Sequence, residues 1–166
     1  MNRENSVVAY VVRIKFLGYG FYVDKDGGQL CIHRKSVEKL KMKIREITGR
    51  SNGWSIQYRK DRLNALIRGW VNYFKLAKMK TRLKELDGWI RRRIRMVTWK
   101  RRKTVRTKFK NLKKTALDEK TAWYLATTRN KYWYVAGSPW MQTAIPNKML
   151  EMAGYLTLSG CYAKVK

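Results

Sequence analysis

The sequence predicts a mainly α-helical protein with a small β element at its N-terminal end. Residues typical of strands gather before residue 34, and apolar residues recur at spacings of three and four from residue 36 onward. Of the 166 residues, 45% are hydrophobic, which is enough for one core. We therefore expect a β-hairpin within residues 1–33, followed in residues 34–166 by a three-helix bundle and a short helical C-terminal extension.

The predicted β element rests on composition and on one turn. The segment from Val7 to Leu17 is rich in β-branched residues, and Asp24–Gly28 has the composition of a turn between two short strands, Phe21–Val23 and Leu30–Ile32. An isolated hairpin is marginally stable in water. We expect this one to pack on the helices that follow.

Three apolar stripes predict the helices of the bundle. The first helix should begin at Ser36, a capping residue, and end at Gly49. The stripe of the first helix is Val37, Leu40, Ile44 and Ile47. The stripe of the second helix is Leu63, Leu66, Ile67, Trp70, Phe74 and Ala77. The third helix should start near Arg82, and its stripe is Leu83, Leu86, Ile90, Ile94 and Val97.

The C-terminal extension contains two further helix signals. Asp118 and Glu119 place acidic side chains where a helix running through Ala126 would begin, which suits the helix dipole. Ser138 and Pro139 precede a second predicted helix, from about Trp140 to Met152.

The charge of the chain indicates a polyanionic partner. There are 39 Lys and Arg residues against 11 Asp and Glu, which gives a formal net charge of +28. Such an excess destabilises a compact state by self-repulsion, and phosphate backbones are its usual counter-charge. A membrane is not expected as a partner, because the apolar stripes are the ones that a helical bundle must bury.

One segment carries much of this charge. Between Trp89 and Lys114 there are thirteen basic residues and no acidic one. Like charges four residues apart on a helix repel each other by roughly 0.2–0.5 kcal/mol per pair, so the counter-charge must come from outside the segment. Aromatic residues lie among these charges, which favours RNA, whose unpaired bases can stack on them.

The predicted RNA-binding residues come from this segment, from the basic faces of the first two helices and from a basic, aromatic stretch near residue 130. They are Lys39, Lys41, Lys43, Arg45, Arg59, Lys60, Arg62, Arg91, Arg92, Arg93, Arg95, Trp99, Lys100, Arg101, Arg102, Lys103, Arg106, Lys108, Lys110, Lys113, Lys114, Arg129, Lys131, Tyr132 and Trp133.

The sequence predicts no catalytic, cofactor-binding or metal site. Asp24 and Asp26 are the closest acidic pair and are better explained by turn formation. His33, the single histidine, has no evident catalytic partner, and Cys31 and Cys161 lack the spacing of a zinc site. No signal peptide or apolar run of about eighteen residues is present, so a cytoplasmic protein is expected.

Several sequence blocks resemble a known family, the maturase-specific region, or thumb, of group II intron-encoded reverse transcriptases. They follow the order and spacing of that family. The blocks are residues 15–21 (KFLGYGF), 32–36 (IHRKS), 43–48 (KIREIT), 69–74 (GWVNYF), 86–96 (LDGWIRRRIRM) and 106–112 (RTKFKNL).

The resemblance implies an architecture and a source. Residues 1–33 resemble the last hairpin of a polymerase palm, and residues 34–166 resemble the thumb with its maturase extension, in the compact bacterial type that lacks an endonuclease module. It also implies a bacterial mobile genetic element and a role in RNA splicing. The family's Tyr-x-Asp-Asp motif is absent from this sequence. We therefore expect no autonomous polymerase activity, and magnesium only through the RNA or a missing polymerase core.

Three functions remain open at this point. The first is a maturase that binds group II intron RNA and assists its folding and splicing without catalysing the reaction. The second is the thumb of a reverse transcriptase whose fingers and palm belong to a separate chain. The third is general DNA binding, because backbone contacts do not distinguish the two nucleic acids. A decayed remnant with no present role is a further alternative.

Overall fold

The computed structural model describes residues 10, 14–25, 27–49 and 51–166. Within them lie a two-stranded antiparallel hairpin and nine helices, which confirms the predicted fold class. The elements are β1 (Tyr19–Asp24), β2 (Gly27–Ile32), α1 (Arg34–Ile47), α2 (Ile56–Tyr73), α3 (Lys80–Arg101), α4 (Val105–Leu112), α5 (Glu119–Thr127), α6 (Tyr132–Ala136), α7 (Pro139–Ala144), α8 (Asn147–Met152) and α9 (Leu158–Val165).

The hairpin is longer than predicted and is attached to the end of α2. Its strands pair from Tyr19 with Ile32 to Asp24 with Gly27, so Gly27 and Gly28 belong to β2, and the turn between the strands is shorter than the predicted range 24–28. The Tyr19 hydroxyl donates to Tyr73 O at 2.5 Å, at the C-terminal end of α2. The segment from Val7 to Leu17, whose composition is typical of strands, falls largely on residues outside those the structure describes.

The start of α1 differs from the prediction. Ser36 was expected to cap this helix, but the cap is His33, whose ring Nδ1 accepts a hydrogen bond from Lys35 N at 3.2 Å. Ser36 is buried, and its hydroxyl donates to Gly18 O at 2.8 Å. Gly18 has φ +85° and a side chain there would lie 2.9 Å from the Ser36 hydroxyl, so the close approach requires glycine.

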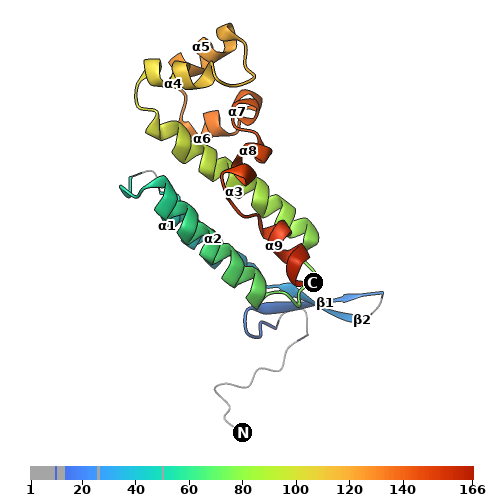
Figure 1. The fold of residues 1–166 in the computed structure, drawn as a ribbon. Coiled ribbons are helices and arrows are strands. Elements are labelled where there is room, and N and C mark those ends of the chain that lie inside the picture. The colour runs from blue at the N-terminus through green and yellow to red at the C-terminus, as the bar shows by residue number, and fades with distance from the viewer. Residues whose placement is uncertain (1–9, 11–13, 26, 50) are drawn as a thin grey trace.

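The three long helices form the core. Figure 1 shows α1 and α2 side by side, and α3 running from the hairpin end of the molecule to a group of shorter helices. The predicted stripes supply the buried residues, and Leu40, Ile44, Ile67 and Leu83 are all at most 1% exposed. None of the described helices combines the length and the apolar character that a membrane crossing requires.

The C-terminal segment returns to this core. The Asn64 amide in α2 donates to Gly154 O at 2.8 Å and accepts from Leu156 N at 3.0 Å. Further along, the buried Tyr162 hydroxyl donates to Ala77 O at 2.8 Å. Helix α9 therefore packs against both α2 and α3.

A buried carboxylate joins α3 to α9. Asp87 is 2% exposed and accepts three hydrogen bonds from the first turn of α9: from Leu158 N at 2.7 Å, from Ser159 N at 3.0 Å and from the Ser159 hydroxyl at 2.5 Å. The first amides of a helix have no partner within the helix, and a carboxylate suits the positive end of its dipole. Asp87 thus supplies a tertiary cap for α9.

The shorter helices α4 to α7 gather at the far end of α3 (Figure 1). Helix α5 begins at Glu119, as predicted from the acidic pair, and Asp118 caps it, since its Oδ2 accepts from Thr121 N at 2.9 Å. The single helix predicted from Trp140 to Met152 is wrong. Pro146 lacks an N–H and disfavours helical backbone at the preceding Ile145, so the segment divides into α7 and α8.

We expect Asp87→Ala to lower the free energy of unfolding by about 2–4 kcal/mol, because it removes three hydrogen bonds to a charged acceptor and leaves the buried donors unpaired. Asp87→Asn retains one acceptor oxygen and should lose less. Urea denaturation followed by circular dichroism measures both. The control is Glu85→Ala on the same helix, where an exposed ion pair should contribute within about 0.5 kcal/mol. Equal effects at both positions would contradict the assignment.

Candidate nucleic-acid interface

Three arginines of the basic run on α3 point into the protein. Arg95 is 5% exposed, and its guanidinium donates to Ile145 O and Asn147 Oδ1, both at 2.8 Å. Arg92 donates to Trp133 O at 2.9 and 3.1 Å. These contacts hold the helices after α5 against α3. They are hydrogen bonds to neutral oxygen atoms, so the positive charges are satisfied without being neutralised.

Arg93 makes the equivalent contact with the end of α1. Its guanidinium donates to the Thr48 hydroxyl at 2.8 Å and to the carbonyl oxygens of Arg45 and Thr48 at 3.2 Å. The last carbonyl groups of a helix have no partner within it and carry the negative end of the dipole. A guanidinium is therefore well suited to this position.

Arg59 fixes the loop between α1 and α2 in the same way. It donates to Gly49 O at 2.6 Å and to Trp54 O at 3.2 Å, and it also contacts the Asn52 side chain. Burial lowers the pKa of both Arg59 and Arg95, and the nearby positive charge of Arg101 and Arg91, respectively, lowers each further. Both guanidinium groups remain charged at neutral pH.

Burial removes part of the predicted RNA-binding set from the surface. Arg59, Arg95 and Trp99 are buried. The half-buried members are Lys41, Lys60, Arg91, Arg92, Arg93, Lys100, Arg102, Lys108, Tyr132 and Trp133. The exposed members are Lys39, Lys43, Arg45, Arg62, Arg101, Lys103, Arg106, Lys110, Lys113, Lys114, Arg129 and Lys131.

Carboxylates neutralise little of this exposed charge. The described residues contain three ion pairs, Arg34 with Glu38, Arg82 with Glu85 and Lys113 with Glu119. All six side chains are at least half exposed, and such pairs contribute little to stability. The surface formed by the exposed basic residues is therefore available to an external anion.

Aromatic rings bring the basic faces of different helices together. The half-buried Trp89 ring of α3 lies within 5.7–5.8 Å of the cationic groups of Lys41, Arg45 and Arg93. Two of these belong to α1, so the basic surfaces of α1 and α3 are continuous around Trp89. Lys108 of α4 lies 4.9 Å from the centre of the buried Trp99 ring.

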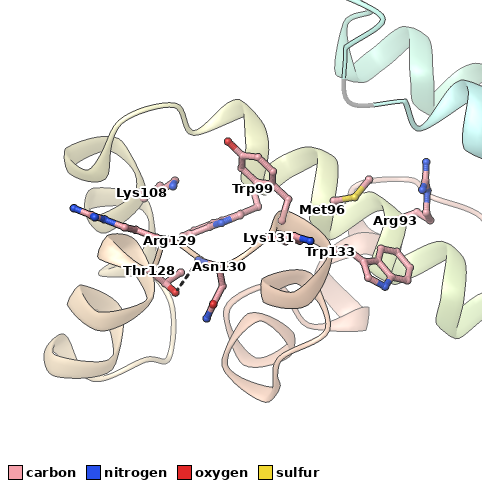
Figure 2. Close-up of a pocket in the computed structure, with 10 residues that line it drawn as sticks. Arg93, Met96, Trp99, Lys108, Thr128, Arg129, Asn130, Lys131 and Trp133 are labelled. Atoms are coloured by element: carbon pink, nitrogen blue, oxygen red, sulfur yellow. Dashed lines mark hydrogen bonds between the residues drawn. The ribbon is translucent and has the colours of Figure 1, made fainter.

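A cavity of about 600 Å³ opens where α3, α4 and the loop between α5 and α6 meet (Figure 2). We call it the loop cavity, and its lining residues are Arg93, Met96, Trp99, Lys108, Thr128, Arg129, Asn130, Lys131, Tyr132 and Trp133. The predicted set includes seven of these side chains but not Met96, Thr128 or Asn130. Polar, uncharged residues give no charge signal in the sequence, although the basic, aromatic stretch at 128–134 marks their position.

Metal chemistry finds no support in the described part of the chain. There, no group of three or more His, Cys, Asp or Glu side chains lies close enough to hold a metal ion. The site is an electrostatic and aromatic surface, suited to binding a polyanion.

Comparison with known protein families identifies part of the chain. Residues 37–116 match the model of one family, the group II intron, maturase-specific domain. The chain carries a group II intron maturase-specific domain. The match runs from within α1 to just beyond α4 and includes the whole basic run from Trp89 to Lys114. A search of curated proteins found no significant match.

The maturase-specific domain supplies only part of the surface described above. Arg93, Met96, Trp99 and Lys108 of the loop cavity belong to it, whereas residues 128–133 lie beyond the matched segment. The boundary of the matched segment also separates helix α9 from its cap, because Asp87 lies within the domain and residues 158–165 lie beyond it.

We expect Arg95→Ala to lower the free energy of unfolding by about 2–4 kcal/mol, because it leaves the buried Ile145 carbonyl and the Asn147 side chain without their donor. Arg106→Ala, at an exposed position on α4, should change it by no more than about 0.5 kcal/mol. Chemical denaturation of both variants measures the difference. A stable Arg95→Ala variant would contradict a structural role for this guanidinium.

Proposed function

We propose that this protein binds group II intron RNA through the exposed basic residues of the run from Trp89 to Lys114 and of the basic faces of α1 and α2. In this way it assists the folding and splicing of that RNA. The observation that carries the proposal is the run of thirteen basic residues without an acidic one, within a domain of this family. The RNA performs the transesterification steps and brings its own magnesium. The protein contributes positive charge and shape.

The distribution of charge supports binding to a phosphate backbone. Lys103, Arg106 and Lys110 lie exposed in and just before α4, and their side chains form no ion pair with any residue that the structure describes. Each phosphate that such a side chain neutralises releases counterions, which favours binding at moderate salt. The basic face of α1 around Trp89 extends this surface across the bundle.

Structured RNA suits this surface better than a uniform duplex. Exposed aromatic side chains lie near the basic residues, and the rings of Trp123 and Tyr124 on α5 are 54% and 57% exposed. Aromatic rings stack on unpaired bases, which occur in the loops and bulges of folded RNA. DNA offers the same backbone charge with fewer unpaired bases, so we place it second.

The hairpin supports a second candidate function, that of the thumb of a reverse transcriptase whose fingers and palm are a separate chain. In the described residues β1 and β2 form a sheet of their own, and Phe16, Leu17 and Val23 are 63–70% exposed. Apolar groups and open strand edges are places where further strands can pair. A palm sheet would offer such strands.

We expect the triple variant Lys103→Glu, Arg106→Glu and Lys110→Glu to bind intron RNA at least about tenfold more weakly than the wild type. The plot of log affinity against log salt has a negative slope, and its magnitude should fall by about three, one for each lost phosphate contact. Filter binding to a group II intron RNA from the encoding genome, at several salt concentrations, measures both quantities.

The matched control reverses three exposed lysines outside the predicted set, at Lys35, Lys75 and Lys84. Both triple variants change the net charge by the same amount, so a general charge effect would weaken them equally. Equal weakening would contradict binding at α4. Arg92, Arg93 and Arg95 are unsuitable for such a test, because their substitution breaks hydrogen bonds within the protein.

The wild-type protein should increase the rate of intron splicing at magnesium concentrations where the RNA alone splices poorly. The physical reason is that bound cationic side chains screen phosphate repulsion in the folded RNA. Splicing of a labelled precursor measures this, with the α4 triple variant as the inactive comparison. A protein that leaves splicing unchanged but restores primer extension to a co-purified polymerase chain would favour the second candidate.

A further inference from the structure

We propose that the loop cavity is a subsite for a single unpaired nucleotide, and that Asn130 contacts the edge of its base. This inference rests on the proposed function, since it concerns how bound RNA is recognised. It adds a specificity-determining residue outside the matched family segment.

The volume of the cavity suits a single unstacked base. That volume, about 600 Å³, lies in the range of pockets that enclose small molecules, about 300–1,000 Å³. Bases in an RNA duplex are stacked, and the edges in their deep major groove are out of reach of side chains. A nucleotide in a bulge or loop can leave the stack and enter such a recess.

The charge around the cavity suits the phosphates on either side of that nucleotide. Arg93, Lys108, Arg129 and Lys131 contribute to its lining, and no carboxylate does. Arg129 and Lys131 are exposed in the loop between α5 and α6, so both can meet a backbone that passes over the opening. Figure 2 shows these basic side chains coming from different elements.

The aromatic side of the cavity is held in a fixed position. The guanidinium carbon of Arg92 lies 4.2 Å from the centre of the Trp133 ring, and the same group donates two hydrogen bonds to Trp133 O. A side chain at Gly137 would clash with this guanidinium, so glycine permits the arrangement. The Trp133 ring and its neighbour Tyr132 are half-buried, which leaves part of each ring for a base to contact.

Asn130 supplies the directional contacts that charge and stacking lack. Its side chain is exposed, and within the described part of the chain no hydrogen bond occupies its amide group. Its backbone N–H is directed to the Thr128 hydroxyl at 3.5 Å, the contact drawn as a dashed line in Figure 2. An amide offers two donors and one acceptor, the combination that pairs with the edge of a base.

The test compares two RNA hairpins of equal length, one fully paired and one with a single bulged 2-aminopurine. We expect the wild-type protein to bind the bulged hairpin roughly fiftyfold more tightly, because stacking of one base contributes about tenfold and the contacts of Asn130 with the base edge contribute the rest. The fluorescence of the bulged base should fall on binding, because it stacks in the cavity. Asn130→Ala should reduce the preference to about tenfold, the share that stacking contributes, while affinity for the paired hairpin stays unchanged.

The matched control is Asn72→Ala, an exposed asparagine of α2, which should retain the full preference. Figure 1 shows the C-terminal end of α2 far from the loop between α5 and α6. Equal affinity of the wild type for both hairpins would overturn the subsite, and an unchanged preference in Asn130→Ala would overturn the role of Asn130. Absence of binding to either hairpin and to intron RNA would instead contradict the proposed function.

Discussion

The fold depends on arginine side chains that reach backbone carbonyl groups at the ends of other segments. Arg93 binds the end of α1, Arg59 the loop that follows it, and Arg92 and Arg95 the segments after α5. With 39 basic and 11 acidic residues, most arginines cannot find a carboxylate. A carbonyl oxygen is an acceptor that every residue provides, and the last turn of a helix presents several without partners. Five donors in a planar fork let one guanidinium connect two or three of them.

Because these arginines bind carbonyl groups, the same side chains contribute to stability and to the positive charge that binds RNA. A carboxylate partner would cancel the charge of each buried arginine, whereas a carbonyl group leaves it in place. The guanidinium groups therefore order the helices and still contribute to the positive field around them. Charge reversals at the buried or half-buried arginines of α3 would consequently remove structure and RNA affinity together, whereas exposed residues such as those of α4 separate the two effects. The same constraint favours glycine at residue 137, since a side chain there would displace the Arg92 guanidinium.

The sequence predicted the hairpin, the three long helices and the basic character of the surface, because periodicity and charge are local properties. It did not predict which arginines are buried. Arg95 and the exposed Arg106 are the same residue type, and Arg95 is buried because its guanidinium donates to the carbonyl oxygen of Ile145, fifty residues along the chain. The cap of α1 was missed for a similar reason. Ser36 has the better capping propensity, but its hydroxyl donates to the carbonyl oxygen of Gly18, just before β1, and His33 caps the helix instead. Helix α9 was missed because its stabilising partner, Asp87, is supplied by α3.

The position of Asp87 also shows that the segment matched by the family and the segment that folds together are not the same. The matched family segment contains this carboxylate, yet the amides that it accepts from lie seventy-one and seventy-two residues further along the chain. A fragment cut to residues 37–116 would hold an unpaired acid beside Leu86 and Ile90 and would expose the faces of α2 and α3 against which α9 packs. During synthesis, the ribosome must therefore release nearly the whole described chain before this part of the core can close. Contacts of such long range slow folding, and they leave the three long helices open to association until the last helix arrives.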